Sequence, residues 1–364
     1  MRRLHVDLGE RSYPIIIGEG IRERMPEFLA EHRIHPNHKL LIVSDASVAK
    51  FHLQPLVDAL HGAAYDVTSH VVPSGEQSKS LDHLEQIVTT ALEAGLNRHS
   101  VIIALGGGVV GDLAGFAAAS YMRGIRFVQM PTTILAHDSS VGGKVGVNHR
   151  LAKNIIGAFH QPEFVCFDTA MLATLPEREI RAGLSEVIKH GLIWDESFVA
   201  WCEDHVEQLL SLESEAIAHA LYEGCKVKAE VVSQDEREGG LRMILNLGHT
   251  IGHALEAVSS YHELEHGEAI SIGMVGSAKL AIRLGYDPLI YTTTKRVLQA
   301  FGLPIRIPAH YDRDRIMSAM MHDKKFKDGK MVFVVPVAIG KVEIRHDIEA
   351  AWIEEIIEEL KQEA

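Results

Sequence analysis

The chain has 364 residues, of which 46% are hydrophobic and 23% charged, and this composition predicts a soluble globular protein long enough for two domains. The formal net charge of −13 argues against a nucleic-acid partner, because phosphate backbones are bound by basic surfaces. The N-terminus has no apolar leader and the chain has no run of 18 apolar residues, so we expect a cytoplasmic protein that does not bind membranes.

The first half of the chain alternates between strand-like and helix-like segments. The strand-like segments are residues 39–45, 65–72, 100–107, 125–131 and 163–169. Helical patterns such as residues 81–96 lie between them, and this order predicts a mostly parallel sheet. We therefore expect a Rossmann-like α/β domain over residues 1–169.

After residue 170 the pattern is mainly helical, apart from a hairpin expected at residues 330–345. This predicts a second, mainly α-helical domain over residues 170–364. No repeat or low-complexity linker separates the two halves. We expect the domains to pack closely, with the active site in the cleft between them.

A glycine-rich turn follows the strand candidate at residues 100–107. Gly106, Gly108 and Gly111 match the G-x-G-x-x-G pattern between a strand and a helix, where glycines allow a pyrophosphate to approach a helix N-terminus. The acidic residue usually found about 20 positions later is absent, so Asp45, which ends the first parallel strand candidate, is the candidate ribose contact. The alternative is a tight turn in which glycine serves packing alone.

Polar side chains are dense after the second and fourth of these strands. The segment from residue 132 to 154 supplies Thr132, Thr133, Asp138, Lys144, Lys153 and Asn154, which we expect on loops. Glu76 and Lys79 follow another strand candidate. Such groups suit a polyhydroxylated or phosphorylated ligand, although a solvated loop explains any single one of them.

The second half places polar residues at helical spacing between apolar ones. Glu186, Lys189 and His190 share one predicted helical face. Asn246, His249 and His253 share another, with Arg242 one turn before them. Each residue alone is more often solvated or a satisfied core residue, but two histidines and a glutamate that converge would form a catalytic zinc pattern.

Residues 262–266 spell HExxH, the motif of zinc peptidases. That motif needs both histidines on one regular helix. Here Gly267 follows at once and the helical pattern starts after it, so we expect His262 in a connecting segment and His266 at the helix entrance. A dinucleotide-type domain also has no use in peptide hydrolysis, and we retain only His266 as a candidate ligand.

Eight segments of the chain, in order, resemble the motif series of the 3-dehydroquinate synthase family. They are "GGGVVGD", "YMRGIRFVQMPTT", "DSSVGGK", "KNIIGAFHQP", "LPEREIRAGLSEVIKHG", "DEREGGLRMILNLGHTIGHALE", "HGEA" and "HDKK". The resemblance covers nearly the whole chain, and eight ordered segments are far more specific than one. One departure is the segment "ILAH" before Asp138, which is a residue shorter than in many members.

The resemblance implies a set of site residues. It places a divalent metal, usually zinc with cobalt as the alternative, on Glu186, His249 and His266. It implies NAD contacts at Asp45, Glu76, Lys79, Gly107, Gly108, Val109, Asp112, Thr132, Thr133, Asp138, Lys144 and Lys153. It implies substrate contacts or catalytic roles for Arg123, Lys144, Lys153, Asn154, Lys189, Lys228, Arg242, Asn246, His253 and Lys324.

The implied reaction converts 3-deoxy-arabino-heptulosonate 7-phosphate to 3-dehydroquinate and phosphate in the shikimate pathway. Oxidation at carbon 5 by NAD makes the proton on carbon 6 acidic, phosphate leaves, the hydride returns, and an aldol closure forms the ring. We also expect a homodimer. Another sugar-phosphate cyclase, an NAD-dependent metal alcohol dehydrogenase of the glycerol dehydrogenase type, and a non-catalytic metal and nucleotide binder are the alternatives.

Overall fold

The structure is a computed structural model that describes residues 1–259, 263–322, 326–327 and 330–363. It divides into two compact units, one formed by Met1–Leu175 with Ile217–Ser233 and the other by Pro176–Ala216 with Gln234–Ala364. Among the described residues, none of the helices combines the length and the apolar composition needed to cross a membrane.

The first unit is built on a seven-stranded sheet. In spatial order its strands are β1 (Arg2–Val6), β2 (Tyr13–Gly18), β9 (Val165–Asp168), β6 (Arg126–Pro131), β5 (Val101–Gly106), β3 (Leu40–Asp45) and β4 (Val67–Val72). β1 pairs antiparallel with β2, and all other neighbours are parallel. The predicted mostly parallel sheet is therefore confirmed, with an antiparallel edge that the strand pattern did not reveal.

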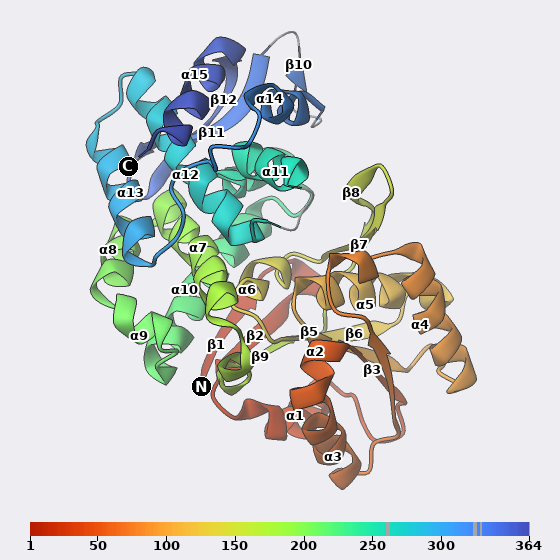
Figure 1. Cartoon of the computed structure of the whole chain (residues 1–364). Helices are drawn as coiled ribbons and strands as arrows, with labels where there is room; N and C mark the ends of the chain where they lie inside the picture. Colours follow the sequence, from red (N-terminus) through yellow and green to blue (C-terminus); the bar gives the residue numbers. More distant parts are fainter. Residues whose placement is uncertain (260–262, 323–325, 328–329, 364) are drawn as a thin grey trace. The chain divides into compact units, whose positions relative to one another are not determined.

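Helices cover both faces of this sheet (Figure 1). They are α1 (Met25–Glu31) and α3 (Gln54–Gly62) on one face, and α4 (Leu81–Glu93) and α5 (Gly108–Ser120) on the other. Successive side chains of a strand point to opposite faces, so Leu40 and Ile42 join one core whereas Leu41 and Val43 join the other. Both faces are apolar, which is why the strands read as nearly continuous hydrophobic runs.

The sheet changes winding direction between β3 and β5. β3 connects through α3 to β4 on one side, whereas β5 connects through α5 to β6 on the other. In doubly wound sheets, ligands bind at the carboxyl ends of the two strands where the direction reverses. The residues that follow β3 and β5 therefore occupy the position where such folds bind a nucleotide.

A hairpin of β7 (Lys144–His149) and β8 (Ala152–Phe159) packs against α5. The expectation of loops was wrong for the residues of this hairpin, and also for Asp138, which lies in the short helix α6 (Ala136–Ser139). Strands β7 and β8 were not predicted because their sequences contain glycine, which is typical of loops. Gly146 faces Gly157 across the pair, and a side chain on Gly157 would lie 2.2 Å from the Val145 carbonyl oxygen, so glycine here permits close pairing of the backbones.

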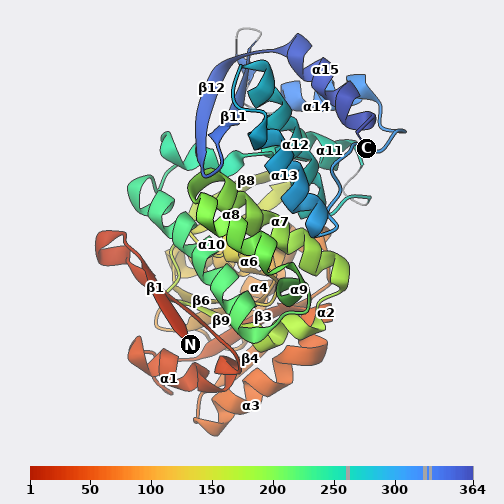
Figure 2. The same cartoon turned by 90° about the vertical axis from the view of Figure 1, so that its left-hand side faces the viewer.

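The second unit is mainly helical, as predicted, and α12 lies at its centre beside α7, α11 and α13 (Figure 2). Its helices are α7 (Glu177–Trp194), α8 (Glu196–Asp204), α9 (Val206–Leu210), α11 (His249–Val258), α12 (His266–Arg283), α13 (Leu289–Ala300), α14 (Arg313–His322) and α15 (Ala350–Lys361). Strands β10 (Phe326–Lys327), β11 (Lys330–Ala338) and β12 (Lys341–Glu349) form a small antiparallel sheet, which confirms the predicted hairpin. Helix α10 (Ser214–Gln234) begins in this unit and contributes most of its length to the first.

The predicted helical face from Arg242 to His253 is interrupted. A 3₁₀ helix, η7 (Leu241–Asn246), ends before Gly248, and α11 begins at His249. Gly248 has a φ of +80°, and a Cβ there would lie 2.7 Å from the Ile270 carbonyl oxygen on α12. The close approach of α12 and the left-handed backbone both require glycine at this point, and together they break the helix that the spacing suggested.

Candidate functional site

The middle of α7 carries charged side chains on a buried face. The Glu186 and Lys189 side chains are each 1% exposed and form an ion pair. Their neighbours Leu184 and Val187 are fully buried. Because a desolvated charge is tolerated only with a partner, these two residues mark a polar site inside an apolar unit.

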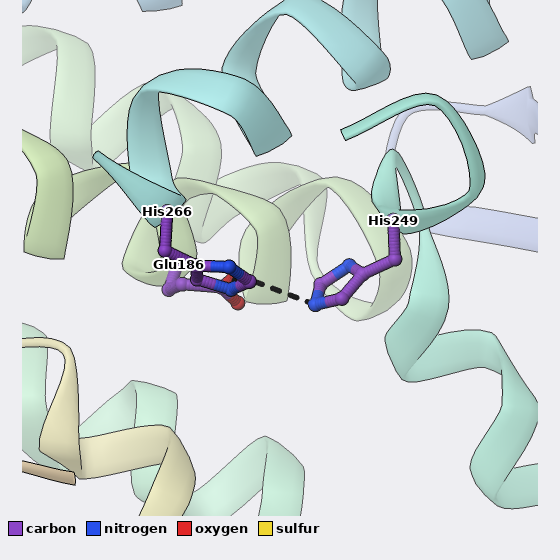
Figure 3. A group of neighbouring side chains, drawn as sticks. All are labelled: Glu186, His249 and His266. Atoms are coloured by element: carbon purple, nitrogen blue, oxygen red, sulfur yellow. Dashed lines mark ion pairs between the residues drawn. The ribbon is translucent and has the colours of Figure 1, made fainter. Parts of the chain in front are cut away.

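Three candidate metal ligands converge from three helices. Glu186 lies in α7, His249 begins α11, and His266 begins α12 (Figure 3). Glu186 Oε1 lies 3.6 Å from His249 Nε2 and 3.3 Å from His266 Nε2. Two ligand atoms about 2.0–2.2 Å from a tetrahedral zinc ion are about 3.3–3.6 Å apart, so the separations of Glu186 from the two histidines fit such a cation.

The remaining ring nitrogen of each histidine has its own partner. His249 Nδ1 lies 3.1 Å from the Leu247 carbonyl oxygen, and His266 Nδ1 lies 3.2 Å from Glu256 Oε2. These acceptors suit hydrogen on Nδ1, which leaves Nε2, the nitrogen that faces Glu186, to bind a cation. Metal-binding histidines in proteins commonly have this arrangement.

The two histidines have opposite pKa shifts. Burial, helped by the Lys189 ammonium, holds the pKa of His249 well below its ordinary value. Burial also acts to lower the pKa of His266, but hydrogen bonds to Glu186 and Glu256 outweigh it and raise the pKa to about 10. His249 is therefore neutral and ready to bind a cation at pH 7, whereas a cation at His266 would displace a proton.

Other predicted substrate residues lie near these helices in sequence. His253 is exposed on α11, with its ring centroid 5.1 Å from that of His249 and 5.9 Å from that of His266. Arg242 and Asn246 lie in η7, which packs against α7. The buried Arg242 guanidinium donates a hydrogen bond to the Glu236 carbonyl oxygen. Lys324 lies outside the described residues.

In the first unit, candidate nucleotide residues gather at the carboxyl ends of parallel strands. Asp45 ends β3, Gly107 and Gly108 follow β5, and Thr132 and Thr133 follow β6. Gly107 is the N-cap of α5, and no side chain caps this helix end. The first backbone N–H groups of α5 are therefore suitably placed for an anion.

The glycines of this turn also meet polar side chains closely. A Cβ on Gly107 would lie 3.1 Å from Thr133 Cγ2, and one on Gly108 would lie 3.0 Å from Ser139 Oγ. Val109 follows them in the first turn of α5. The turn therefore has little room for larger residues, so packing and ligand approach both favour glycine here.

Asp45 is held by its neighbours at the end of β3. Its side chain accepts hydrogen bonds from the backbone N–H groups of Ser47 and Val48, which caps the short helix α2 (Ala46–Val48). The Ser74 hydroxyl donates to the same carboxylate oxygen at 2.8 Å. This carboxylate is thus oriented before any ligand binds.

Lys79 connects two further candidate residues. Its buried ammonium donates hydrogen bonds to Asp112 on α5 and to Asn154 on β8. Burial raises the pKa of Asp112, and the Lys79 charge opposes this shift. Through these contacts Lys79 links the loop after β4 to helix α5 and to the β7–β8 hairpin.

The hairpin also reaches Glu76 in the loop after β4. Asn148 Nδ2 donates to Glu76 Oε1 at 2.7 Å, and Lys153 Nζ lies 4.0 Å from the same oxygen. Asn148 Oδ1 in turn accepts the backbone N–H of Asn154 at 2.9 Å. The fold therefore brings five of the predicted residues, Glu76, Lys79, Asp112, Lys153 and Asn154, into one network.

Three predicted cationic residues of the first unit lie elsewhere. Lys228, on α10, pairs with Asp138 of α6, its Nζ 3.0 Å from Oδ2. Lys144 is exposed at the start of β7. Arg123 is exposed just after α5, at the opposite end of that 13-residue helix from Gly107 and about 20 Å away along its axis.

Two residues of these networks were not among the predicted ones. Asn148 joins the hairpin to Glu76, and Glu256 contacts His266. For Asn148 no local pattern signals the contact, which depends on the fold. Glu256 does have a signal, because it lies three residues after His253 and seven after His249, on the same face of α11.

The fold and the site define a class of proteins that join a nucleotide-type α/β unit to a helical unit with a glutamate and two histidines grouped as metal ligands. The family models "3-dehydroquinate synthase N-terminal" and "3-dehydroquinate synthase C-terminal" match residues 69–182 and 183–326. The chain is 47% identical over 355 residues to the 3-dehydroquinate synthase of Desulforamulus reducens, a match that covers 97% of this chain and 98% of the relative. The chain belongs to the 3-dehydroquinate synthase family, the lyases that form the carbocycle of the shikimate pathway.

Solved structures share this fold. A 2-deoxy-scyllo-inosose synthase complexed with carbaglucose-6-phosphate, NAD⁺ and Co²⁺ superposes with a TM-score of 0.89 at 26% identity, covering 98% of this chain and 99% of that one. A 2-epi-5-epi-valiolone synthase from Streptomyces hygroscopicus with NAD⁺ and Zn²⁺ bound superposes with a TM-score of 0.88 at 27% identity, covering 98% of both chains. These structural relatives bind NAD⁺ together with a divalent metal ion.

Proposed function

We propose that this chain converts 3-deoxy-arabino-heptulosonate 7-phosphate to 3-dehydroquinate and phosphate, with NAD and one divalent metal ion as cofactors. The observation that carries the proposal is the convergence of Glu186, His249 and His266 at separations that suit a tetrahedral cation. Family membership supports the substrate, and the bound ligands of the structural relatives support the cofactors.

NAD, when bound, would supply reversible hydride transfer at carbon 5 of the substrate. We assign its binding to the α/β domain of residues 1–169. Asp45 would accept hydrogen bonds from a ribose hydroxyl, and the uncapped N-terminus of α5 after Gly107 would meet the pyrophosphate. The Lys79 network would hold the loop after β4 against α5, so that the nucleotide meets a rigid surface.

The metal ion, when bound, acts as a Lewis acid toward the substrate hydroxyl oxygens, an effect worth several kcal/mol. We assign its binding to the helical domain of residues 170–364, on Glu186, His249 and His266. Zinc is the metal we propose first, because two imidazoles and a carboxylate at this spacing suit it, and cobalt is the alternative. The Lys189 ammonium beside Glu186 would remain within reach of a substrate oxygen.

Basic side chains would hold the anionic groups of the substrate. Lys144, Lys153, Lys189, Lys228, Arg123, Arg242 and Lys324 are the proposed contacts, together with Asn154, Asn246 and His253. In a protein with a net charge of −13, a site that gathers these basic residues would be a local exception. Charge-assisted hydrogen bonds to phosphate contribute about 1.5–3 kcal/mol each, and exposed His253 would move protons or orient hydroxyls.

We also propose a cytoplasmic homodimer. The three cysteines are buried free thiols, as expected in a reducing compartment. Strand β8 lies at the edge of a two-stranded sheet and exposes Leu151, Ile155 and Phe159 nearby, an apolar group that a second copy could cover. Light scattering on the purified chain tests this state, and a monomer at micromolar concentration contradicts it.

The experiment that tests the reaction uses sub-stoichiometric NAD and substrate deuterated at carbon 5. Phosphate release should continue for many turnovers, and the label should appear at the corresponding carbon of the cyclic product. Steady NADH production without phosphate release indicates an alcohol dehydrogenase instead. Turnover of a sugar phosphate that lacks the carboxylate, without turnover of 3-deoxy-arabino-heptulosonate 7-phosphate, indicates another sugar-phosphate cyclase.

A further inference from the structure

We propose that Glu256 is a positioning residue that orients His266 for metal binding, an inference that rests on the metal site proposed above. Glu256 lies on α11, and its side chain is 9% exposed. Its Oε2 lies 3.2 Å from His266 Nδ1, whereas His266 Nε2 lies 3.3 Å from Glu186 Oε1. The imidazole of His266 is thus flanked by one carboxylate on each nitrogen.

The two nitrogens of an imidazole are chemically similar, so a neighbour must decide which one carries the hydrogen. At His249 the Leu247 backbone carbonyl accepts from Nδ1, and the start of α11 sets that contact. At His266 the acceptor is the side chain of a different helix. The His266 side chain is also 31% exposed, compared with 11% for His249, so packing restrains it less.

The position of Glu256 on α11 links the two histidines. It lies seven residues after His249, so one helical face carries a ligand at its start and the carboxylate two turns later. A carboxylate this buried is costly without a partner. By accepting Nδ1–H it leaves the Nε2 lone pair for the cation and makes the ring a stronger donor.

A competing interpretation is a second cation between His253, Glu256 and His266, whose ligand atoms also lie within 4.8 Å of one another. That site would use the second ring nitrogen of His266 while Nε2 faces Glu186. Simultaneous use of both sites would require His266 to lose both ring hydrogens. The geometry therefore favours Glu256 as a hydrogen-bond acceptor. The number of ions bound per chain distinguishes this interpretation from a second cation site.

The test compares zinc affinity of the full chain and its variants by competition with a chromogenic chelator. We expect Glu256→Leu, which removes the acceptor, to weaken zinc binding about 10- to 100-fold. Glu256→Gln keeps an acceptor oxygen and loses the charge, so its loss should be smaller, under about tenfold. Glu263→Gln is the matched control, because Glu263 contacts exposed His310 and its replacement should leave affinity unchanged.

His266→Ala separates this inference from the proposed site. Loss of zinc in His266→Ala but wild-type affinity in both Glu256 variants overturns the role of Glu256 alone, whereas full zinc binding in His266→Ala overturns the metal site itself. Two bound zinc ions per wild-type chain, with the second lost in Glu256→Gln, support the competing interpretation. Nitrogen-15 spectra of the wild-type zinc form give an answer independent of variant folding. Hydrogen on Nδ1 of His266 is the expected tautomer, and hydrogen on Nε2 contradicts it.

Discussion

Gly267→Ala should weaken metal binding although position 267 supplies no ligand. Gly267 directly follows His266, and a Cβ there would lie 1.8 Å from the Ala182 carbonyl oxygen on α7. Ala182 lies four residues before Glu186, so this contact sets the distance between two of the helices that carry ligands. A Cβ atom essentially never lies under 3.0 Å from a non-bonded heavy atom, so the helices must separate by about 1.2 Å, the difference between 3.0 and 1.8 Å.

That movement carries His266 away from Glu186. Their ligand atoms are 3.3 Å apart, and an opening of about 1.2 Å increases this distance to as much as about 4.5 Å, whereas tetrahedral zinc requires about 3.3–3.6 Å. We expect zinc affinity to fall about 100-fold or more, equivalent to about 2.7 kcal/mol. Overpacking should also destabilise the fold by about 1–3 kcal/mol.

The assay is chelator competition for zinc, with thermal unfolding followed by circular dichroism. Gly62→Ala is the control, because Gly62 ends helix α3 with nothing within 4 Å of its added Cβ. That variant should bind zinc like the wild type and have a similar or slightly higher Tm. Zinc affinity of Gly267→Ala within threefold of the wild type would refute the argument that this helix contact sets the ligand spacing.

Three further predictions concern the anion site, the thiols and the C-terminus. Arg123→Ala and Lys189→Ala should each weaken binding of a phosphonate substrate analogue about tenfold or more, measured by calorimetry on the metal- and NAD-loaded protein, with metal content intact; unchanged affinity in both would remove them from the substrate site. Burial raises the pKa of Cys166, and raises the pKa of Cys202 and of Cys225 to about 12, so a disulfide reagent should modify none of them in the folded protein at pH 8. Rapid modification of one thiol before unfolding would contradict this. Burial acts to raise the pKa of Glu363, but hydrogen bonds from Lys279 and Lys295 outweigh it and lower the pKa from the ordinary 4.5 to about 2. Because the folded-state pKa is depressed, the ionised Glu363 carboxylate stabilises the folded state above pH 4.5, and this contribution is lost as the pH falls toward 2. Glu363→Gln should cost about 1–3 kcal/mol in urea unfolding at pH 7 and progressively less below pH 4.5, and a cost independent of pH would show that the charge is not responsible.

Local patterns in the sequence determined much of this protein. Runs such as residues 39–45 and 100–107 predicted buried strands, because a strand covered on both faces needs apolar side chains on both. The glycines around Gly107 predicted a turn at a helix N-terminus, because glycine there lets an anion approach the backbone. Gly267, immediately after His266, was enough to doubt a zinc-peptidase helix, and α12 does begin at His266. Eight ordered motifs then predicted the family, which the comparisons confirmed.

Only the tertiary structure decided which polar residues meet. Glu186, His249 and His266 lie on three helices up to 80 residues apart in sequence, and packing brings their ligand atoms within 4.8 Å. The break at Gly248 and the strands around Gly157 escaped prediction for one physical reason. Glycine is compatible with a turn, a strand or a close helix contact, and the neighbouring element determines which of these forms. Glu256 became a candidate for a different reason. Its partner His266 belongs to another helix, and only the folded chain places Glu256 Oε2 3.2 Å from His266 Nδ1.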